Sequence, residues 1–514
     1  MKKYDAIVIG SGNGGLSAAL TLATAGKKIL VLEQHNLPGG CATSFVRGRF
    51  EFEATLHEFC NVGCPGDWGG VGKILAEEYK LPIEWVQIKD LFRVIGTARS
   101  GRRYDVVMPT GEEEFIAAME KAVPGSEGPV REFFRLVKAC IAASDYFDQA
   151  GEGGKFSYAT FLKEHNEFLK VAELPFNEVL RRIDMPEDAI DILGTYWPYM
   201  GESAEEISFI QEATMFYTYV VKHPATLPMT AHNLSVTCVE RLRELGADIW
   251  MNVKALKVVG GPDGRICGVD TTAGFIPARY VIANMSPHTA YTQLLDSSVK
   301  VPERACRLIN RQTFSSSFLV VYLGLNKSPE ELGLSDYTIF YPGVMDSETN
   351  HRETMDIEGN YRGAATVYNI ELPGISPPGT TMMSICITYS RELWGDFTRK
   401  EYDRMKTEVA TKAIKTFEEA AGVKVSPYIE EMEIATPRTF SRYLGLPMGV
   451  VYGYSPVGWD TMVSRLMSAK KDQPVPGFLT VGASGPHGSG YSQTFLDGNY
   501  MGKMLLKEME ADHE

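Results

Sequence analysis

The chain has 514 residues, of which 44% are hydrophobic and 23% are charged, and its formal net charge is −14 at pH 7. This length exceeds a single ordinary hydrophobic core, so we expect two intertwined domains. The acidic balance argues against nucleic acid as a partner and against charge-driven binding to anionic lipid. No apolar run reaches the roughly 18 residues of a membrane-spanning helix.

The eight cysteines are scattered, and Cys60 and Cys64 form the only close pair. No second Cys or His pair completes a zinc site, so we predict no metal and interpret these residues as reduced thiols. The apolar run that starts at Tyr4 is interpreted as a strand and not as a signal peptide. Together these features predict a cytoplasmic protein, and peripheral membrane contact through apolar residues stays open.

The first 33 residues carry a dinucleotide-binding fingerprint. A buried strand over 4–9 is followed by Gly10-x-Gly12-x-x-Gly15, a helix to about residue 25, a second strand over 28–32 and then Glu33. Gly10 allows a tight turn, Gly12 lets backbone N–H groups approach a pyrophosphate, and Gly15 lets the helix pack closely on the strand. Glu33 is placed to accept hydrogen bonds from a ribose hydroxyl.

A second glycine pair, Gly39-Gly40, follows directly in the stretch QHNLPGGCATSF over residues 34–45. Another close backbone approach at this point suits FAD better than NAD, because the ribityl arm of FAD runs on along the protein. Here the sequence resembles the FAD-dependent phytoene desaturases, carotenoid isomerases and retinol saturases. The GGCATSF form is similar to the isomerase and saturase branch.

The resemblance implies that residues 47–59 pass beside the isoalloxazine ring. Three polar side chains in this stretch, Glu53, His57 and Glu58, are therefore candidate catalytic residues for proton transfer. The alternative is that they only hydrogen-bond the flavin edge or the backbone.

Residues 112–221 show apolar residues at helical spacing in several segments. We predict a helical insert whose Phe, Tyr, Met and Trp side chains either line a tunnel for a long apolar molecule or form ordinary core. A helix over 235–245 and strands over 247–253, 256–259, 266–269 and 275–284 come next. By the resemblance this block is the returning half of the FAD domain. Relatives have a glycine pair before this helix, where this chain has Pro228 to Asn233.

Strand-like runs over 317–323, 337–341, 364–370 and 382–389 precede a predicted helix over 407–421. Several consecutive strands with one packing helix indicate a mixed α+β substrate domain. In the last segment a strand, a glycine-rich loop over 482–490 and a helix follow one another. Such a helix start can stabilise negative charge at the flavin pyrimidine edge.

The predicted fold class is α/β, with a Rossmann-type FAD domain assembled from three segments. The predicted boundaries are 1–110, 222–300 and 431–514 for the FAD domain, 111–221 for the helical insert and 301–430 for the substrate domain. The predicted cofactor is FAD, and its predicted binding residues are Gly10, Gly12, Asn13, Gly14, Gly15, Glu33, Gln34, Gly39, Gly40, Ser44, Val253, Gly482, Ala483, Gly490, Tyr491 and Ser492.

The resemblance implies an oxidoreductase that acts on carbon–carbon double bonds of a carotenoid, retinoid or related lipid. Desaturation, saturation and cis–trans isomerisation all stay open, as do the electron partner and the oligomeric state. The alternatives are a flavin-dependent fatty-acid hydratase or isomerase, a flavin amine oxidase, and a lipid-binding scaffold similar to the Rab GDP-dissociation inhibitors. The intact glycine motifs argue against the scaffold.

Overall fold

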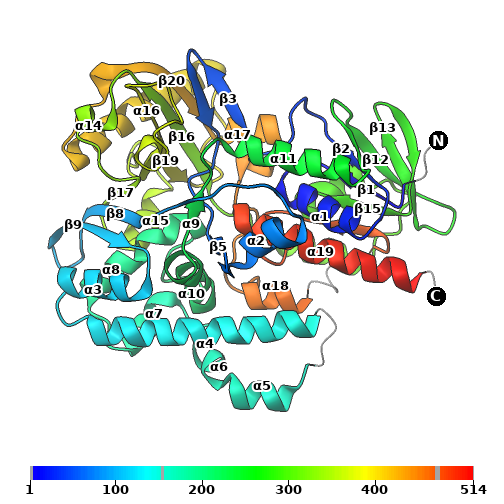
Figure 1. Cartoon of the computed structure of the whole chain (residues 1–514), viewed down its shortest axis with the longest axis horizontal. Coiled ribbons are helices and arrows are strands. Elements are labelled where there is room, and N and C mark those ends of the chain that lie inside the picture. The colour runs from blue at the N-terminus through cyan, green and yellow to red at the C-terminus, as the bar shows by residue number, and fades with distance from the viewer. Residues whose placement is uncertain (1–3, 152–155, 469–474, 513–514) are drawn as a thin grey trace.

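The computed structural model describes residues 4–151, 156–468 and 475–512. Its first layer is a parallel sheet of five strands in the order β11-β2-β1-β15-β21. The strands are β1 (Ala6–Ile9), β2 (Ile29–Leu32), β11 (Asp248–Trp250), β15 (Tyr280–Ala283) and β21 (Phe478–Thr480). Three distant parts of the chain therefore form one sheet, on the right of Figure 1.

Helices pack on this sheet through small residues. The helix α1 (Asn13–Thr24) lies along the C-terminal helix α19 (Tyr491–Ala511). A Cβ atom at Gly498 of α19 would lie 2.2 Å from the Gly14 carbonyl oxygen. The absence of that Cβ atom lets the two helices approach closely. The helix α11 (Ala231–Glu244) also packs against α1.

The second sheet has seven strands in the order β20-β16-β19-β18-β17-β8-β9. All neighbours are antiparallel except β17 and β8. The strands are β8 (Asp90–Thr97), β9 (Arg103–Pro109), β16 (Ser317–Leu325), β17 (Thr338–Val344), β18 (Ala364–Val367), β19 (Thr381–Tyr389) and β20 (Ile429–Ala435). The helix α16 (Arg399–Ala421) contacts β17, β20 and β8.

Two strands of this sheet lie wholly outside the segment 301–430 predicted for it, and β20 crosses its predicted end. β8 and β9 precede residue 110, within the segment predicted as the first part of the FAD domain, yet β8 pairs with β17. Sequence periodicity identifies a strand but not its partner, which here lies more than 200 residues away.

The predicted helical insert is present and lies at the lower left of Figure 1. Its buried aromatic and aliphatic side chains form one hydrophobic cluster with parts of β8 and β9. The helices are α3 (Glu112–Ala122), α4 (Glu127–Gly151), α5 (Tyr158–Glu164), α6 (Asn166–Val171), α7 (Phe176–Arg182), α8 (Glu187–Leu193), η2 (Gly194–Tyr196), α9 (Trp197–Met200), α10 (Phe209–Phe216) and η3 (Tyr217–Val221).

Smaller elements connect the layers. The strands are β3 (Ser44–Arg47), β4 (Phe50–Glu53), β5 (Gly63–Cys64), β6 (Asp67–Trp68), β7 (Val86–Gln87), β10 (Ala225–Thr226), β12 (Ala255–Gly260), β13 (Ile266–Thr271) and β14 (Gly274–Pro277). The helical segments are α2 (Gly70–Lys73), η1 (Ile74–Glu78), α12 (Pro287–Thr289), η4 (Ala290–Leu294), α13 (Glu303–Arg311), α14 (Pro329–Leu332), α15 (Ser347–Glu353), η5 (Tyr368–Ile370), η6 (Ser426–Tyr428), α17 (Pro437–Leu444), η7 (Pro447–Gly449) and α18 (Met462–Ser468).

Two helices begin earlier than predicted. α16 starts at Arg399 and not at Thr407, because Thr398 and Glu401 form a capping box at its start. α11 starts at Ala231 and not at Ser235. The predicted strand over 275–284 is two strands, β14 and β15, in different sheets. Of the helices in the described ranges, none combines the length and apolar character needed to cross a bilayer.

Candidate functional site

A large cavity of about 770 Å³ connects the two sheets. One end lies at the carboxyl ends of β1, β2 and β15, where Gly10, Glu33 and Asn284 line it. Ligands of open parallel α/β sheets bind at this edge. The other end lies among side chains of α9, α10, β16 and β19, including Tyr199, Met215 and Cys386. The same cavity therefore reaches both the glycine fingerprint and the seven-stranded mixed sheet.

The glycine loop between β1 and α1 is packed so closely that side chains are excluded. A Cβ atom at Gly15 would lie 2.1 Å from the Gly10 carbonyl oxygen, and one at Gly12 would lie 2.5 Å from the terminal amide of Asn284. Gly12, Asn13 and Gly14 all line the cavity at the start of α1. Backbone N–H groups at a helix start favour an anion such as a pyrophosphate.

Asn284 is a site residue that the sequence analysis missed. It follows β15, and its side-chain amide spans the loop. When the amide oxygen is assigned to the atom that faces Gly12, the orientation that satisfies both neighbours, it accepts from the Gly12 N–H (3.1 Å) and the amide nitrogen donates to the Val481 carbonyl (3.3 Å). It thereby joins the first and last segments of the five-stranded sheet. Its position directly after a buried strand, YVIA, is the signal that could have identified it.

Glu33 is held in place by three hydrogen bonds. Its Oε2 accepts from the N–H (2.9 Å) and the hydroxyl (2.6 Å) of Ser11, and its Oε1 accepts from the His35 N–H (2.9 Å). The Val253 N–H donates to the Glu33 carbonyl (2.9 Å). Glu33, Gln34 and Val253 all line the cavity. The carboxylate keeps free lone pairs, so it is oriented to accept from a further donor.

The glycine pair Gly39-Gly40 lies against the glycine loop between β1 and α1. The Gly39 N–H donates to the Ser11 carbonyl (2.9 Å), and a Cβ atom at Gly39 would lie 2.0 Å from the Ala42 carbonyl oxygen. Gly39 and Gly40 line the cavity. Ser44, which was predicted to bind the cofactor, does not line the cavity. It lies in β3, and its hydroxyl donates to Glu51 Oε1 (2.5 Å).

The C-terminal loop closes the same end of the cavity. The Gly482 N–H donates to Asp497 Oδ2 (2.9 Å), and Gly490, with φ of +104°, precedes α19. The Tyr491 hydroxyl donates to the Cys41 carbonyl (3.1 Å), and the Ser492 hydroxyl donates to the Cys60 carbonyl (2.6 Å). Gly482, Ala483, Gly490, Tyr491 and Ser492 line the cavity, so the C-terminal motif and the N-terminal fingerprint meet.

Glu53 lies outside the residues that line this cavity. Its buried carboxyl accepts from the Ala231 N–H (2.6 Å) at the first turn of α11 and from the Leu56 N–H (3.2 Å). Burial raises the pKa of Glu53 to about 7, although the hydrogen bonds from these backbone N–H groups act to lower it. These hydrogen bonds indicate that the Glu53 side chain has a structural role as an anchor that links β4 to the start of α11.

His57 and Glu58 both line the cavity. Burial lowers the pKa of His57 to about 4, so its imidazole is neutral at pH 7. Burial raises the pKa of Glu58 to about 7. Glu58 Oε1 accepts from the Tyr199 hydroxyl (3.2 Å), and Oε2 is buried with no hydrogen-bond partner among the described residues.

Tyr199 comes from the helical insert and was not predicted as a site residue. Its ring lies 5.3 Å from that of Tyr196, 5.7 Å from that of Phe340 and 6.5 Å from that of His57, measured between centroids. Burial raises the pKa of Tyr199 well above its usual value, so the phenol stays protonated. No local motif marks Tyr199, because its partner Glu58 is 141 residues away.

The remaining wall of this end is largely apolar. One side of α10 and η3 faces the cavity with Gln211, Thr214, Met215 and Thr218, at helical spacing. The other apolar and aromatic lining residues from this end include Met200, Tyr219, Phe314, Phe318, Val320, Tyr368, Phe440, Tyr452, Tyr454 and Met462. This composition suits an apolar ligand with few polar groups.

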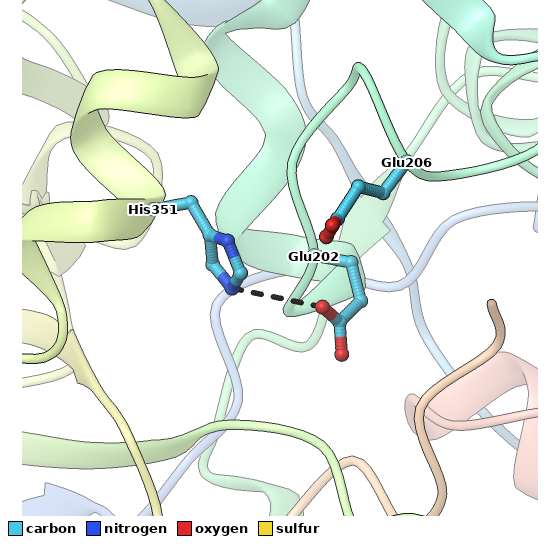
Figure 2. Close-up of side chains that lie close together, drawn as sticks. All are labelled: Glu202, Glu206 and His351. Carbon is cyan, nitrogen blue, oxygen red and sulfur yellow. Dashed lines mark ion pairs between the residues drawn. The ribbon is translucent and has the colours of Figure 1, made fainter.

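A separate cluster is formed by Glu202, Glu206 and His351 (Figure 2), whose nearest ligand atoms lie within 4.8 Å of one another. His351 Nε2 lies 3.6 Å from Glu202 Oε2, and the His351 ring also packs edge-on against Trp197. Figure 2 shows Glu206 beside this pair, and its side chain is exposed. Each of the three side chains offers one ligand atom that could coordinate a metal ion.

The five-stranded sheet, its glycine loops and the mixed sheet define an α/β protein with a dinucleotide-binding Rossmann-like unit. Residues 8–64 match the family of NAD(P)-binding Rossmann-like domains. The whole fold is similar to substrate-bound putrescine oxidase, with a TM-score of 0.62, 15% identity and 99% of both chains covered. It is also similar to an oxidoreductase from Methanosarcina mazei, with a TM-score of 0.60, 13% identity and coverage of 98% and 99%.

In sequence, the chain is 21% identical to all-trans-retinol 13,14-reductase of Homo sapiens, over 94% of this chain and 82% of that protein. It is 25% identical to the chloroplastic prolycopene isomerase of Daucus carota, over 89% and 73%. An inactive all-trans-retinol 13,14-reductase of Danio rerio is also 25% identical, over 64% and 55%. The chain is thus a distant homologue of retinol reductases and prolycopene isomerases over most of its length.

Proposed function

We propose that this protein is an FAD-dependent oxidoreductase that acts on a carbon–carbon double bond of a long apolar substrate, such as a carotenoid, retinoid or related lipid. The observation that carries the proposal is the shared cavity, which runs from the dinucleotide loops into a chamber lined by aromatic and methionine side chains. The distant homology to reductases and isomerases of such molecules supports it.

The residues at the first end fit FAD. Backbone N–H groups at the start of α1 suit the pyrophosphate, and Glu33 suits the ribose hydroxyls. Asn13 Oδ1 is buried there without a partner among the described residues, which leaves an acceptor for a cofactor donor. Gly39 and Gly40 extend the close backbone surface beyond the ribose site. The loop over 482–490 and the start of α19 would face the flavin ring.

Bound FAD would supply two-electron chemistry, and the protein would do the rest. The aromatic chamber would hold the double bond and exclude water. The neutral His57 imidazole and the buried Glu58 carboxyl are the titratable groups placed to exchange protons with substrate. Desaturation, saturation and isomerisation all use these parts, so the proposal covers all three.

The test mixes dithionite-reduced, FAD-loaded protein with all-trans-retinol or with prolycopene in the absence of oxygen. Flavin reoxidation with loss of a double bond would indicate saturation, and a product of altered geometry without net reoxidation would indicate isomerisation. The oxidised protein is mixed with phytoene in parallel, and flavin bleaching would indicate desaturation. If no lipid changes and none alters the flavin, this function is wrong.

A further inference from the structure

Glu58 is set apart from the other buried carboxyls by its position in the cavity and by its one open oxygen. It is 8% exposed, lines the cavity and has Oε2 unpaired among the residues the structure describes. Glu53 is equally buried but faces backbone N–H groups. Glu212 is 1% exposed, with both carboxyl oxygens unpaired among the described residues, and does not line the cavity.

Tyr199 determines which oxygen of Glu58 is available. The phenol donates to Oε1 (3.2 Å), so a carboxyl proton is favoured on Oε2. Oε2 makes no hydrogen bond with the described residues, although the nearby Thr338 hydroxyl acts to lower the pKa of the carboxyl. The carboxyl can therefore present its O–H to the cavity while Tyr199 holds the opposite oxygen.

No positive charge among the described residues stabilises the ionised form of Glu58, and only the Tyr199 and Thr338 hydroxyls favour it. The groups whose charges interact with it are phenols from η2, α9, η3, the residue before β17, η5 and the segment after η7, namely Tyr196, Tyr199, Tyr219, Tyr337, Tyr368 and Tyr452. Each has a raised pKa and stays neutral. Burial likewise raises the pKa of the neighbouring Cys60 thiol, while His57 is neutral. The surroundings therefore favour a protonated carboxyl.

We propose that Glu58, oriented by Tyr199, is the acid that protonates one carbon of the substrate double bond during saturation. The inference rests on the proposed function. The π bond breaks and two C–H bonds form: one carbon receives a hydride equivalent from the two-electron-reduced flavin, which is oxidised, and the other receives the Glu58 proton. The Glu58 O–H bond breaks, and the carboxylate that remains accepts from the Tyr199 hydroxyl until solvent returns the proton.

His57 and Glu53 do not fit this role. The neutral imidazole of His57 has no proton to give beyond its single N–H at pH 7, because its pKa is about 4. The carboxyl of Glu53 is engaged by the start of α11. Tyr199 is accordingly a positioning residue. Through Tyr199, the helical insert would orient the acid at the end of the cavity where the substrate reacts.

The experiment compares four full-length FAD-loaded proteins: wild type, Glu58→Gln, Tyr199→Phe and the matched control Glu212→Gln. The first readout is independent of activity: the infrared carbonyl band of protonated carboxyls, followed from pH 5 to pH 10. We expect Glu58→Gln to remove a band that titrates near pH 7, Tyr199→Phe to shift the frequency of that band, and Glu212→Gln to remove a different band that titrates near pH 8.

The second readout is the rate at which a lipid substrate reoxidises the reduced flavin. Loss of a general acid lowers a rate by about 100-fold or more, so we expect that loss in Glu58→Gln. Tyr199→Phe loses one hydrogen bond to a charged group, so we expect its rate of flavin reoxidation to fall by about tenfold. The rate of Glu212→Gln should stay within about twofold of the wild-type rate, as for a change outside the site.

The outcomes separate the two proposals. If wild-type flavin reacts with no lipid, the proposed function fails and this inference fails with it. If wild type reacts and Glu58→Gln reacts at the same rate, or if removing Glu58 removes no carboxyl band, the inference alone is overturned. Equal flavin content, and equal unfolding temperatures at pH 5, where Glu58 and Glu212 are both protonated, check that the four proteins share the wild-type fold.

Discussion

The two ends of the cavity are built from different parts of the chain. At the dinucleotide end, backbone atoms and glycines from three motifs meet, and the carboxylate of Glu33 is fixed by Ser11 and His35. At the other end, side chains from the insert and the mixed sheet meet, and the carboxyl of Glu58 keeps an open oxygen. The carboxylate at the dinucleotide end is held in one orientation by three hydrogen bonds, whereas the carboxyl at the other end has an unpaired buried oxygen that is available for proton transfer.

We expect the largest effect when a side chain is placed in the glycine loop at the dinucleotide end of the cavity. In Gly12→Val, the new Cβ atom would lie 2.5 Å from the Asn284 amide, within the loop that would face the pyrophosphate of bound FAD. We expect FAD affinity to fall by more than about 100-fold, the effect of losing two or more charge-assisted hydrogen bonds. FAD titration measures it, and circular dichroism of the apoprotein checks the fold.

Gly128→Ala is the matched control, since a Cβ atom there meets no atom within 4 Å. Gly128 lies in α4 and does not line the cavity. Its FAD affinity should equal that of wild type. Wild-type affinity in Gly12→Val would contradict the placement of the cofactor.

The second effect concerns a carboxyl with no role at either end. Burial raises the pKa of Glu212 to about 8. Since the folded-state value lies above the unfolded one, the folded protein holds this proton more tightly, and the stability it contributes is lost as pH rises from about 4.5 through about 8. Glu212→Gln should therefore gain stability over wild type at pH 9, by a few kcal/mol, and little at pH 5.

Chemical denaturation of both proteins at the two pH values measures this difference. An equal gain at pH 5 and pH 9 would show that Glu212 does not titrate in this range. A loss at pH 9 would show that its carboxylate has a partner in the folded protein.

The third effect tests whether Glu53 is an anchor. Its two oxygens accept from the Ala231 and Leu56 N–H groups, and the amide of Glu53→Gln can satisfy only one of them. We expect a loss of about 1–3 kcal/mol in the free energy of unfolding. Glu84→Gln, at an exposed position, should change it by less than about 0.5 kcal/mol.

If Glu53→Gln abolishes flavin reoxidation while leaving stability unchanged, Glu53 belongs to the chemistry and the distinction between Glu53 and Glu58 is wrong. Urea unfolding and the reoxidation assay are both needed, because an anchor lowers stability first.

The smallest effect is expected at Asn284, which bridges Gly12 and Val481 through its side chain. Asn284→Ala leaves the glycines in place but removes the bridge, so FAD affinity should fall by about tenfold, the worth of one hydrogen bond at the upper end of its range. FAD titration checks this value. A loss as large as that of Gly12→Val would mean that Asn284 itself contacts the cofactor.

The sequence predicted the dinucleotide end well because its determinants are local. Strand, glycine loop, helix and acid follow one another within residues 4–33, and the structure places β1, α1 and β2 there. It also predicted the helical insert and four strands of the mixed sheet. Asn284 was missed, because a single polar residue after a strand has no motif.

The other end depends on contacts between distant residues. The pairing of β8 with β17 and the hydrogen bond between Glu58 and Tyr199 join parts of the chain that no periodicity connects. Glu53, His57 and Glu58 were indistinguishable as candidates until their surroundings were known. One faces backbone N–H groups and two face the cavity.

The most direct measurement is the absorbance spectrum of the purified protein after incubation with FAD and removal of the excess. The account predicts the paired near-ultraviolet and blue bands of an oxidised flavin, retained in proportion to protein and lost in Gly12→Val. A colourless wild-type protein that takes up no FAD would contradict it, because the glycine loops, Glu33 and the cavity that they share with Glu58 would then serve another ligand.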